Sequence, residues 1–201
     1  MKGGRRSTSG QAPTFSRLFK FMAKLMDSGE RREFKSGAVR DLAEGKGRMD
    51  LVPLDVAAHF LIRYREKTDV EDFQFGAALV LACLNKFIDS CRSGEPNDGY
   101  IYEAMVIETR ALYSDPYTAI MEVSKQYEDG AKKYSERNWE KGIPVRCYID
   151  SSCRHLMKVG AGWDDEEHSR ASLWNLFSLA WTIKHHPELL QEFVTELKQI
   201  K

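Results

Sequence analysis

Apolar residues recur at helical spacing along most of this chain, and no other feature of the sequence limits the fold as strongly. Side chains three and four residues apart lie on one face of a helix. No stretch alternates apolar and polar residues for long, so a core built on a β-sheet is not expected. The sequence therefore predicts an all-α fold, a helical bundle. The expected helices cover residues 50–66, 70–92, 100–112, 117–134, 147–160 and 166–184, and a short helix ends the chain.

Turn-forming residues separate these segments. Residues 92–99 contain Gly, Pro, Asn and Asp, and His186-Pro187 is expected to end the last long helix. The aromatic and β-branched residues within 100–112 also allow a short strand there. The stretch 67–116 resembles an inserted helical piece within the bundle.

Composition excludes a transmembrane protein and makes several other classes of protein unexpected. The 201 residues suit one domain, and no apolar stretch approaches the roughly 18 residues of a membrane-spanning helix. Thirty basic and thirty acidic residues cancel, so no global positive field attracts nucleic acid. The four cysteines form no CxxC pair and no signal peptide is recognisable, so neither a disulfide framework nor a structural zinc site is expected. These features predict a cytoplasmic protein without membrane partners.

The zero net charge conceals a basic N-terminus. Residues 1–26 carry six basic residues and no acid. Residues 1–13 have the composition of a disordered basic tail, and residues 14–35 form an N-terminal region that begins with a basic amphipathic helix pattern. This region would bind a polyanion such as DNA or an anionic surface, act as a targeting peptide, or simply pack on the body or on a second subunit.

A glycine-rich basic segment follows. Arg40, Lys46 and Arg48 flank Gly45 and Gly47, which would let the backbone approach an anion while the side chains supply donors. The segment lacks the P-loop pattern. It is therefore either a substrate-binding segment or a solvated linker before a helix.

Charged and polar residues gather again between 127 and 175. On a helix, Asp150, Arg154 and Lys158 share one face, with His155 at its edge. On the next helix, His168, Ser172 and Asn175 share a face. Two neighbouring helices would thus direct carboxylate, imidazole, amide and guanidinium groups into one cleft. Acids that hold Mg²⁺ or Mn²⁺ and bases that hold phosphates together indicate phosphoryl chemistry.

Each of these residues also has a structural interpretation. Trp139 and Trp174 are more often core residues than platforms for a base. The acidic run 164–167 suits a helix start, and His168 could hydrogen-bond within the bundle. His59 is interpreted as structural, and the pair 185–186 as a helix end. The combination, more than any single residue, favours a functional site.

Four strings carry a resemblance to a known family: SGAVRD followed by GKGRMDLVP, then YEDGAKKYSERNWEKGIP, YIDSSCRHLMK, and DDEEH followed by WN. Together they resemble the phage and bacterial dATP/dGTP diphosphohydrolase domain family (MazZ-like), which is similar to the all-α nucleotide pyrophosphohydrolases of MazG type. The resemblance covers about 36–66 and 117–184. It implies that residues 36–201 form a helical pyrophosphohydrolase-like domain with an insertion at about 67–116.

The resemblance also implies an activity. Such enzymes hydrolyse a purine deoxynucleoside triphosphate, dGTP or dATP, to the monophosphate and pyrophosphate with Mg²⁺ or Mn²⁺. In the cytoplasm of an infected bacterial host this remodels the nucleotide pool. A homo-oligomer is expected by the same resemblance. The alternatives are a hydrolase of another nucleotide, or a non-enzymatic phage protein that binds nucleotide or DNA.

Site residues follow by matching these motifs, together with nearby charged groups. The expected catalytic residues are Asp150, Arg154, His155, Lys158 and His168. The expected substrate-binding residues are Arg40, Lys46, Arg48, Lys133, Tyr134, Asn138, Trp139 and Asn175. The paired ExxE and ExxD acids of MazG enzymes are missing from the corresponding helices. The nearest candidates for metal ligands are therefore Glu122, Glu128, Asp150, Asp165 and Glu166.

Overall fold

A computed structural model describes residues 31–41, 44–65 and 72–199. The chain divides into two compact units, residues 1–46 and 47–201. Residues 1–30 are not among those described. The expected basic tail 1–13 and the amphipathic pattern that begins at residue 14 therefore lie outside the described part of the chain, as far as residue 30. No helix in the described ranges combines the length and the apolar character needed to cross a membrane.

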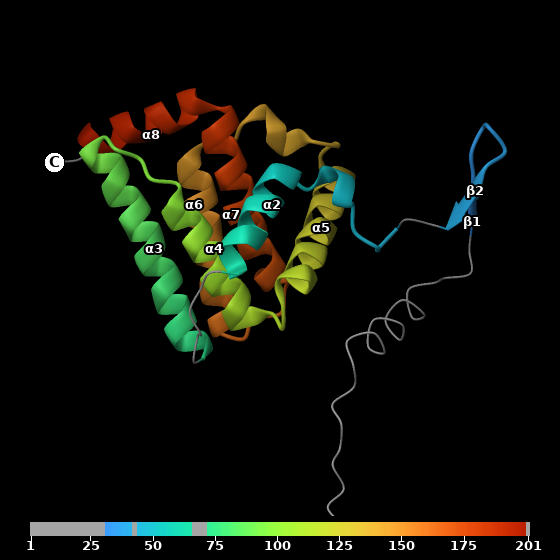
Figure 1. The fold of residues 1–201 in the computed structure, drawn as a ribbon, viewed down its shortest axis with the longest axis horizontal. Coiled ribbons are helices and arrows are strands. Elements are labelled where there is room, and N and C mark those ends of the chain that lie inside the picture. The colour runs from blue at the N-terminus through green and yellow to red at the C-terminus, as the bar shows by residue number, and fades with distance from the viewer. Residues whose placement is uncertain (1–30, 42–43, 66–71, 200–201) are drawn as a thin grey trace, which may run out of the picture. The chain divides into compact units, whose positions relative to one another are not determined.

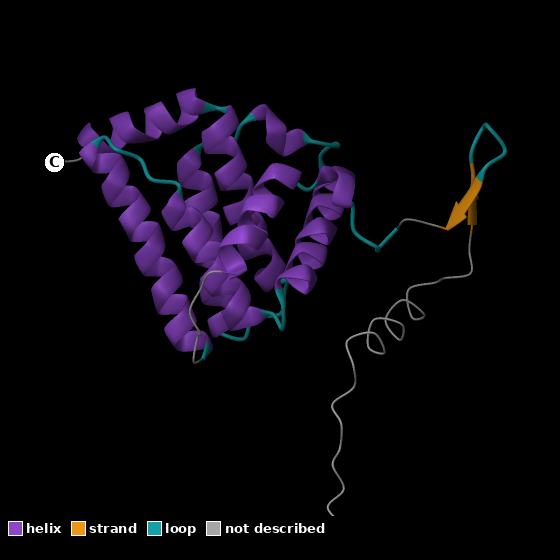
Figure 2. Ribbon diagram, viewed as in Figure 1, coloured by secondary structure: helices purple, strands orange, loops and turns teal. Residues whose placement is uncertain are grey.

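The described part of the first unit is a β-hairpin. Strand β1 (Arg31–Glu33) pairs antiparallel with β2 (Val39–Asp41), with Arg32 opposite Arg40. The amide of Gly37 donates to the carbonyl of Phe34 at 2.8 Å and closes the turn. Residues 31–33, at the end of the region 14–35, thus form a strand. In the described ranges these are the only strands (Figure 2).

The second unit is helical, which confirms the predicted all-α fold. Short 3₁₀ helices η1 and η2 accompany the longer α-helices. The elements are η1 (Met49–Leu51), α2 (Leu54–Arg65), α3 (Phe73–Ser93), α4 (Gly99–Leu112), α5 (Pro116–Lys133), η2 (Asn138–Lys141), α6 (Val145–Gly160), α7 (His168–His185) and α8 (Pro187–Gln199). Residues 100–112 are helical throughout, so the short strand considered for them is absent.

Local signals set the helix ends. The carboxylate of Asp72 accepts the amide N–H of Phe75 at 2.8 Å and caps the start of α3. Gly94 ends that helix in the left-handed conformation, at φ 86°. Asp115 caps α5, and Pro116 takes its first position, where a missing N–H has no cost.

Helix α7 runs through the centre of the bundle. It packs against α2, α4, α5, α6 and α8, and in Figure 1 α3 and α5 lie on opposite sides of this central group. Leu173, Leu176, Phe177 and Ala180, spaced along one side of α7, are buried. The polar residues His168, Ser172 and Asn175 of α7 are buried too, and Ser172 hydrogen-bonds to Ser152 of α6.

The described part of the stretch 67–116, from residue 72 on, takes part in the same core. Helix α3 packs along α4, and α4 packs on α7. Ile101, Ala104 and Met105 of α4 are fully buried. Helix α4 thus links α3 to the central helix α7.

Candidate functional site

A cavity of about 500 Å³ opens between α5, η2, α6 and the first half of α7. Three kinds of side chain line it. Four aromatic residues form one wall, cations and amides surround them, and an imidazole and carboxylates occupy the end near the start of α7. The rings of the wall, which contact one another, are Tyr127, Trp139, Tyr148 and Trp174, and Tyr134 lines the cavity as well. The cations and amides are Lys133, Arg137, Arg170, Gln126, Asn138 and Asn175; the other end holds His155, Glu166 and Glu167.

The aromatic wall is continuous with the core. The Tyr127 ring lies 5.2 Å from Trp139 and 5.6 Å from Trp174, centroid to centroid. The buried hydroxyl of Tyr127 hydrogen-bonds to Ser178 at 2.9 Å, and burial raises the pKa of that phenol well above its usual range. Trp139 is only 6% exposed. The two tryptophans therefore serve as core residues and also border the cavity.

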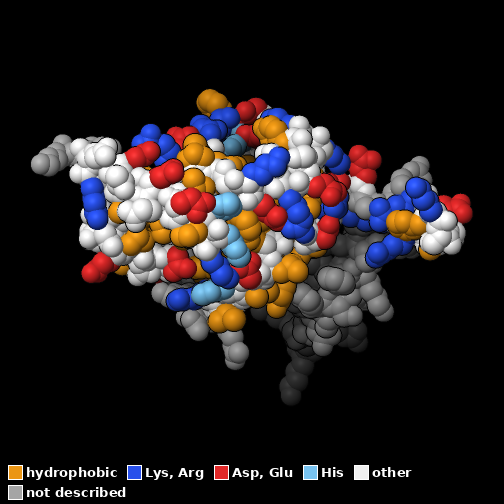
Figure 3. Space-filling view, turned by 90° about the horizontal axis from the view of Figure 1, so that it is seen from above, with side chains coloured by type: hydrophobic (Ala, Val, Ile, Leu, Met, Phe, Trp, Pro, Cys, Tyr) orange, Lys and Arg blue, Asp and Glu red, His pale blue; other side chains and the backbone are white. Residues whose placement is uncertain are grey.

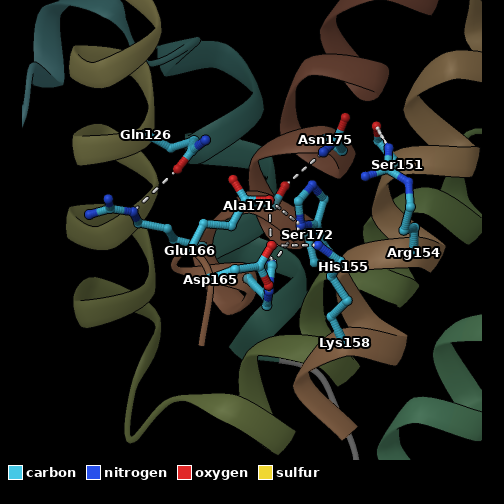
Figure 4. A network of polar contacts seen from close by, with 12 residues as sticks. Gln126, Ser151, Arg154, His155, Lys158, Asp165, Glu166, Ala171, Ser172 and Asn175 are labelled. Carbon is cyan, nitrogen blue, oxygen red and sulfur yellow. Dashed lines mark hydrogen bonds and ion pairs between the residues drawn. The ribbon is translucent and has the colours of Figure 1, made fainter. Parts of the chain in front are cut away.

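Two histidines and a glutamate converge at the α6–α7 end (Figure 4). Nδ1 of His155 lies 3.0 Å from Nδ1 of His168, and 3.2 Å from Oε1 of Glu166. The third edge, from His168 Nδ1 to Glu166 Oε1, measures 3.5 Å. His155 comes from α6 and His168 from the first turn of α7, so the short acidic turn between these helices brings the three groups together.

A fourth group orients this cluster. Asp165 Oδ1 lies 2.8 Å from Nε2 of His168, and its Oδ2 accepts from Nζ of Lys158 at 2.8 Å. The hydrogen bond from Lys158, followed by that from His168, lowers the pKa of Asp165 to about 2. Burial lowers the pKa of His155, against the opposing effect of Glu166. At neutral pH the cluster thus contains an uncharged His155 beside ionised Asp165.

The cluster has the donor types of a metal site. His155, Glu166 and His168 each offer one ligand atom, and these atoms lie within 4.8 Å of one another. An aspartate that fixes the other nitrogen of a histidine is a usual companion of a metal-bound imidazole. The residues present therefore fit a divalent ion at the edge of the cavity.

The other expected metal ligands lie elsewhere. Glu122 pairs with Lys125 at 2.5 Å. Glu128 accepts the amide N–H of Gly47 at 2.9 Å and pairs with Lys132. These acids do not line the cavity, because the helical phase of α5 turns residues 126, 127, 130 and 131 toward it instead.

Asp150 and Arg154 also lie outside the cavity lining. The Asp150 side chain is 75% exposed and lies 3.6 Å from Arg154. Arg154 donates to Ser151 Oγ at 2.8 Å, to one side of the histidine cluster in Figure 4. Lys158 reaches the cluster only through Asp165. Of the five expected catalytic residues, His155 alone lines the cavity. His168 contacts His155 but is not part of the lining.

The expected substrate-binding residues divide in the same way. Lys133, Tyr134, Asn138, Trp139 and Asn175 line the cavity. Arg40 and Lys46 belong to the unit of residues 1–46. Arg48 pairs with Asp50 at 2.7 Å and with Glu136 at 2.8 Å, and these bonds raise its pKa.

Two cations were missed by the sequence analysis. Arg170 donates to Gln126 at 3.2 Å and to Asp129 at 2.8 Å. Arg137 donates to the carbonyl of Asp50 at 2.7 Å and pairs with Glu140. The signal for Arg170 was present in the sequence, because residues 167, 170, 171, 174 and 175 form one helical stripe that faces the cavity.

Comparison with known families gives one match. Residues 96–192 match the family described as dATP/dGTP diphosphohydrolase, N-terminal. This range includes α4 to α7 and every residue that lines the cavity, but not the segment 36–66. Comparisons with curated proteins and with solved structures gave no match. Residues 96–192 are therefore similar to the dATP/dGTP diphosphohydrolase N-terminal family, which supports the family expected from the motifs and, with it, a nucleotide hydrolase.

Proposed function

We propose that this enzyme binds a purine deoxynucleoside triphosphate, dGTP or dATP, in the cavity and hydrolyses it to the monophosphate and pyrophosphate with a divalent metal ion. One observation carries the proposal. A single cavity of about 500 Å³ places an aromatic wall, three cations and the His155–Glu166–His168 cluster side by side. A triphosphate nucleotide needs these three chemistries together, for its base, its phosphates and its reacting phosphorus.

The aromatic wall supports binding of the base. Trp139, Trp174 and Tyr127 present ring faces and edges against which a purine can pack. Among the described residues, the indole N–H groups of Trp139 and Trp174 have no hydrogen-bonding partner. Purine ring nitrogens are acceptors for such donors. Asn138 adds an amide that can read a base edge, whereas the amide nitrogen of Asn175 already donates to the carbonyl of Ala171 at 2.8 Å.

The cations support binding of the phosphates. Lys133, Arg137 and Arg170 reach the cavity from α5, the start of η2 and α7. Guanidinium groups match phosphate oxygens with paired donors. Arg170 already pairs with Asp129. This ion pair fixes the direction of the Arg170 guanidinium before the substrate arrives. These side chains would orient the triphosphate and stabilise the charge that develops on the leaving pyrophosphate.

His155, Glu166 and His168 would hold the divalent metal ion, for which the family resemblance implies Mg²⁺ or Mn²⁺. A bound divalent ion neutralises phosphate charge and lowers the pKa of an attacking water. Asp165 holds the proton of His168 at Nε2, which leaves Nδ1 free to face the cluster. Lys158 in turn holds Asp165. Asp150 and Arg154 keep their expected catalytic roles only as predictions from the motifs.

The first test is a chromatographic assay of the purified protein with dGTP, dATP, dCTP and dTTP, with Mg²⁺ or Mn²⁺ or with EDTA. We expect dGMP or dAMP together with pyrophosphate, and no turnover in EDTA. Release of inorganic phosphate, turnover in EDTA, or no turnover of either purine nucleotide would contradict the proposal. Pyrimidine turnover alone would indicate another nucleotide hydrolase.

A pair of variants separates the two groups of candidate residues. His168→Ala removes a buried ring from the cluster, so we expect it to abolish turnover. Asp150→Ala changes an exposed residue on the same pair of helices, and the geometry favours retained turnover. Loss of activity in Asp150→Ala, with a native circular dichroism spectrum, would restore the catalytic role inferred from the motif.

We further propose a role in phage nucleotide-pool remodelling within the bacterial cytoplasm, and assembly as a homo-oligomer. Both rest on the family resemblance. Expression in a bacterial host should lower the cellular dGTP or dATP pool relative to the His168→Ala variant. Light scattering on the purified protein should give a mass that is a multiple of the chain mass.

A further inference from the structure

We propose that the His155–Glu166–His168 cluster is a site for a first-row transition-metal ion and discriminates against Mg²⁺. The inference deepens the proposed function, because it specifies the ion for the same site. Metal binding itself needs no nucleotide, however, so it can be measured apart from hydrolysis. The ion class is that of Mn²⁺, Co²⁺ and Zn²⁺, which accept imidazole nitrogen as well as carboxylate oxygen.

The spacing of the donor atoms fits such an ion. The three edges of the cluster measure 3.0, 3.2 and 3.5 Å. Ligand atoms about 2.0–2.2 Å from a metal ion in tetrahedral geometry lie about 3.4 Å apart. The three atoms could therefore contact one ion with small side-chain movements. They come from two helices and the turn that joins them, so the fold itself holds the spacing.

The positions of the protons on the two imidazole rings also support a metal site. Asp165 accepts from His168 at Nε2, so in the neutral ring the lone pair of His168 Nδ1 faces Nδ1 of His155, which then carries the shared proton. When an ion binds, that proton moves from Nδ1 to Nε2 of His155. His168 is held in the ligating form in advance, because Lys158 fixes Asp165 from the other side.

Nitrogen donors decide the selectivity. Mg²⁺ prefers an all-oxygen shell and gives up its water reluctantly, whereas two of the three donors here are imidazoles. The two imidazoles are buried, and the carboxylate is half-exposed. The His168 side chain is 1% exposed while Glu166 is 48% exposed. The protein donors thus close one side of the site, and the open side faces the cavity that His155 and Glu166 line.

The experiment is calorimetric titration of the full chain, freed of metal with EDTA, by Mn²⁺ and by Mg²⁺ without nucleotide. We expect one site per chain that binds Mn²⁺ at least about tenfold more tightly than Mg²⁺. Glu166→Gln and His168→Gln should each weaken Mn²⁺ binding by about tenfold or more. The matched control is Asp164→Asn, an exposed acid of the same turn that is outside the cluster, and it should leave Mn²⁺ affinity unchanged.

Asp165→Asn tests the positioning residue. It should weaken Mn²⁺ binding by about tenfold without changing the stoichiometry, because the neutral amide oxygen of Asn holds the His168 proton at Nε2 less strongly than the carboxylate does. A pulsed electron paramagnetic resonance spectrum of the Mn²⁺ complex should show coupling to histidine nitrogen, lost or reduced in His168→Gln. Circular dichroism would verify that each variant is folded.

The outcomes separate this inference from the proposed function. Equal affinities for Mg²⁺ and Mn²⁺, a spectrum without nitrogen coupling, or variants that bind like the wild type would overturn the site assignment, even if the enzyme hydrolyses dGTP. Selective Mn²⁺ binding with nitrogen coupling, but no turnover of any nucleotide, would leave the site in place and overturn the proposed function.

Discussion

At the scale of single residues, Gly47 lies where the chain crosses α5 before entering η1. Its amide N–H donates to Oε2 of Glu128 at 2.9 Å, and the next amide, of Arg48, donates to the carbonyl of Ser124 at 3.1 Å. The glycine does let the backbone approach an anion, as its sequence context suggested. That anion is a carboxylate of the protein itself.

Gly47→Ala should therefore destabilise the bundle. At φ +84° an alanine is strained, and its Cβ would lie 2.0 Å from Oγ of Ser124. We expect a loss of about 2 kcal/mol or more in the free energy of unfolding, measured with urea. Gly45→Ala is the matched control, since Gly45 has φ +74° and no atom within 4 Å of an added Cβ. Equal losses in the two variants would show that the contact with Ser124 is unimportant.

Glu108 is a residue whose burial the sequence did not reveal. It is fully buried on α4, and its nearest hydrogen-bonding group, Ser172, already donates to the carbonyl of Ser152 at 3.1 Å. Burial raises the pKa of Glu108 to about 8, from 4.5. Between these two values the unfolded chain loses the proton and the folded protein keeps it, so the stability from this group falls as pH rises from about 4.5 to about 8.

Glu108→Met should consequently raise the melting temperature more at pH 8 than at pH 5. Each kcal/mol gained corresponds to roughly 2–4 °C for a chain of this size. Thermal denaturation of both proteins across this pH range measures the effect. Glu95→Met, at an exposed loop position, serves as the control and should show no such trend. If the difference in melting temperature between Glu108→Met and the wild type does not grow with pH, Glu108 is solvated or paired.

At the scale of the elements, two successive helices, α4 and α5, differ in how their first turns are capped. Asp115 accepts the amide N–H groups of Tyr117 and Thr118, both at 2.9 Å, at the start of α5. Asp98 holds the same position before α4 but makes no side-chain capping bond. The backbone of Asp115 is extended, at φ −164° and ψ 161°, whereas that of Asp98 is helical, at φ −67° and ψ −18°, so the same residue type caps only one of the two helices.

Asp115→Ala should cost about 1–2 kcal/mol in the free energy of unfolding, whereas Asp98→Ala should cost less than about 0.5 kcal/mol. Burial opposes ionisation of Asp115, but the bonds from Thr118 and Tyr117 outweigh it and lower its pKa. The contribution is thus complete above the unfolded value of 3.8 and is lost as pH falls through the lower folded value. Urea denaturation at pH 7 and pH 3 would test this, and similar costs for both variants would contradict it.

The helices could be predicted from the sequence because each is set by local periodicity and by Gly, Pro and Asp at its ends. The site could be predicted only in part. His155 and His168 were selected, but their meeting depends on how α6 packs on α7, which no local pattern specifies. Glu128 and Asp150 were plausible ligands by residue type, and the helical phase turns both away from the cavity. The two strands of the hairpin have three residues each, which is too short for a clear alternation of apolar and polar residues, so the hairpin was not predicted.

At the scale of the whole molecule, the charge is distributed unevenly along the chain. Residues 1–46 contain eleven basic and five acidic residues. On the face of the bundle in Figure 3, acidic and basic side chains intermix around histidines. Pairs such as Lys184–Asp55, at 2.7 Å, neutralise one another locally. Any affinity for a polyanion should thus reside in residues 1–46 and not in the bundle.

Removal of residues 1–46 tests that division. The remaining chain, 47–201, contains the cavity and all the described helices, so it should keep a melting temperature within a few degrees of the full chain and the same nucleotide turnover. Binding to single-stranded DNA, measured by fluorescence anisotropy at low salt, should be lost with the segment, because exposed basic residues supply most nonspecific affinity. DNA binding that survives the truncation would locate a polyanion site on the bundle. Loss of turnover by a folded truncated protein would instead assign Arg40 or Lys46 the substrate-binding role that the sequence suggested.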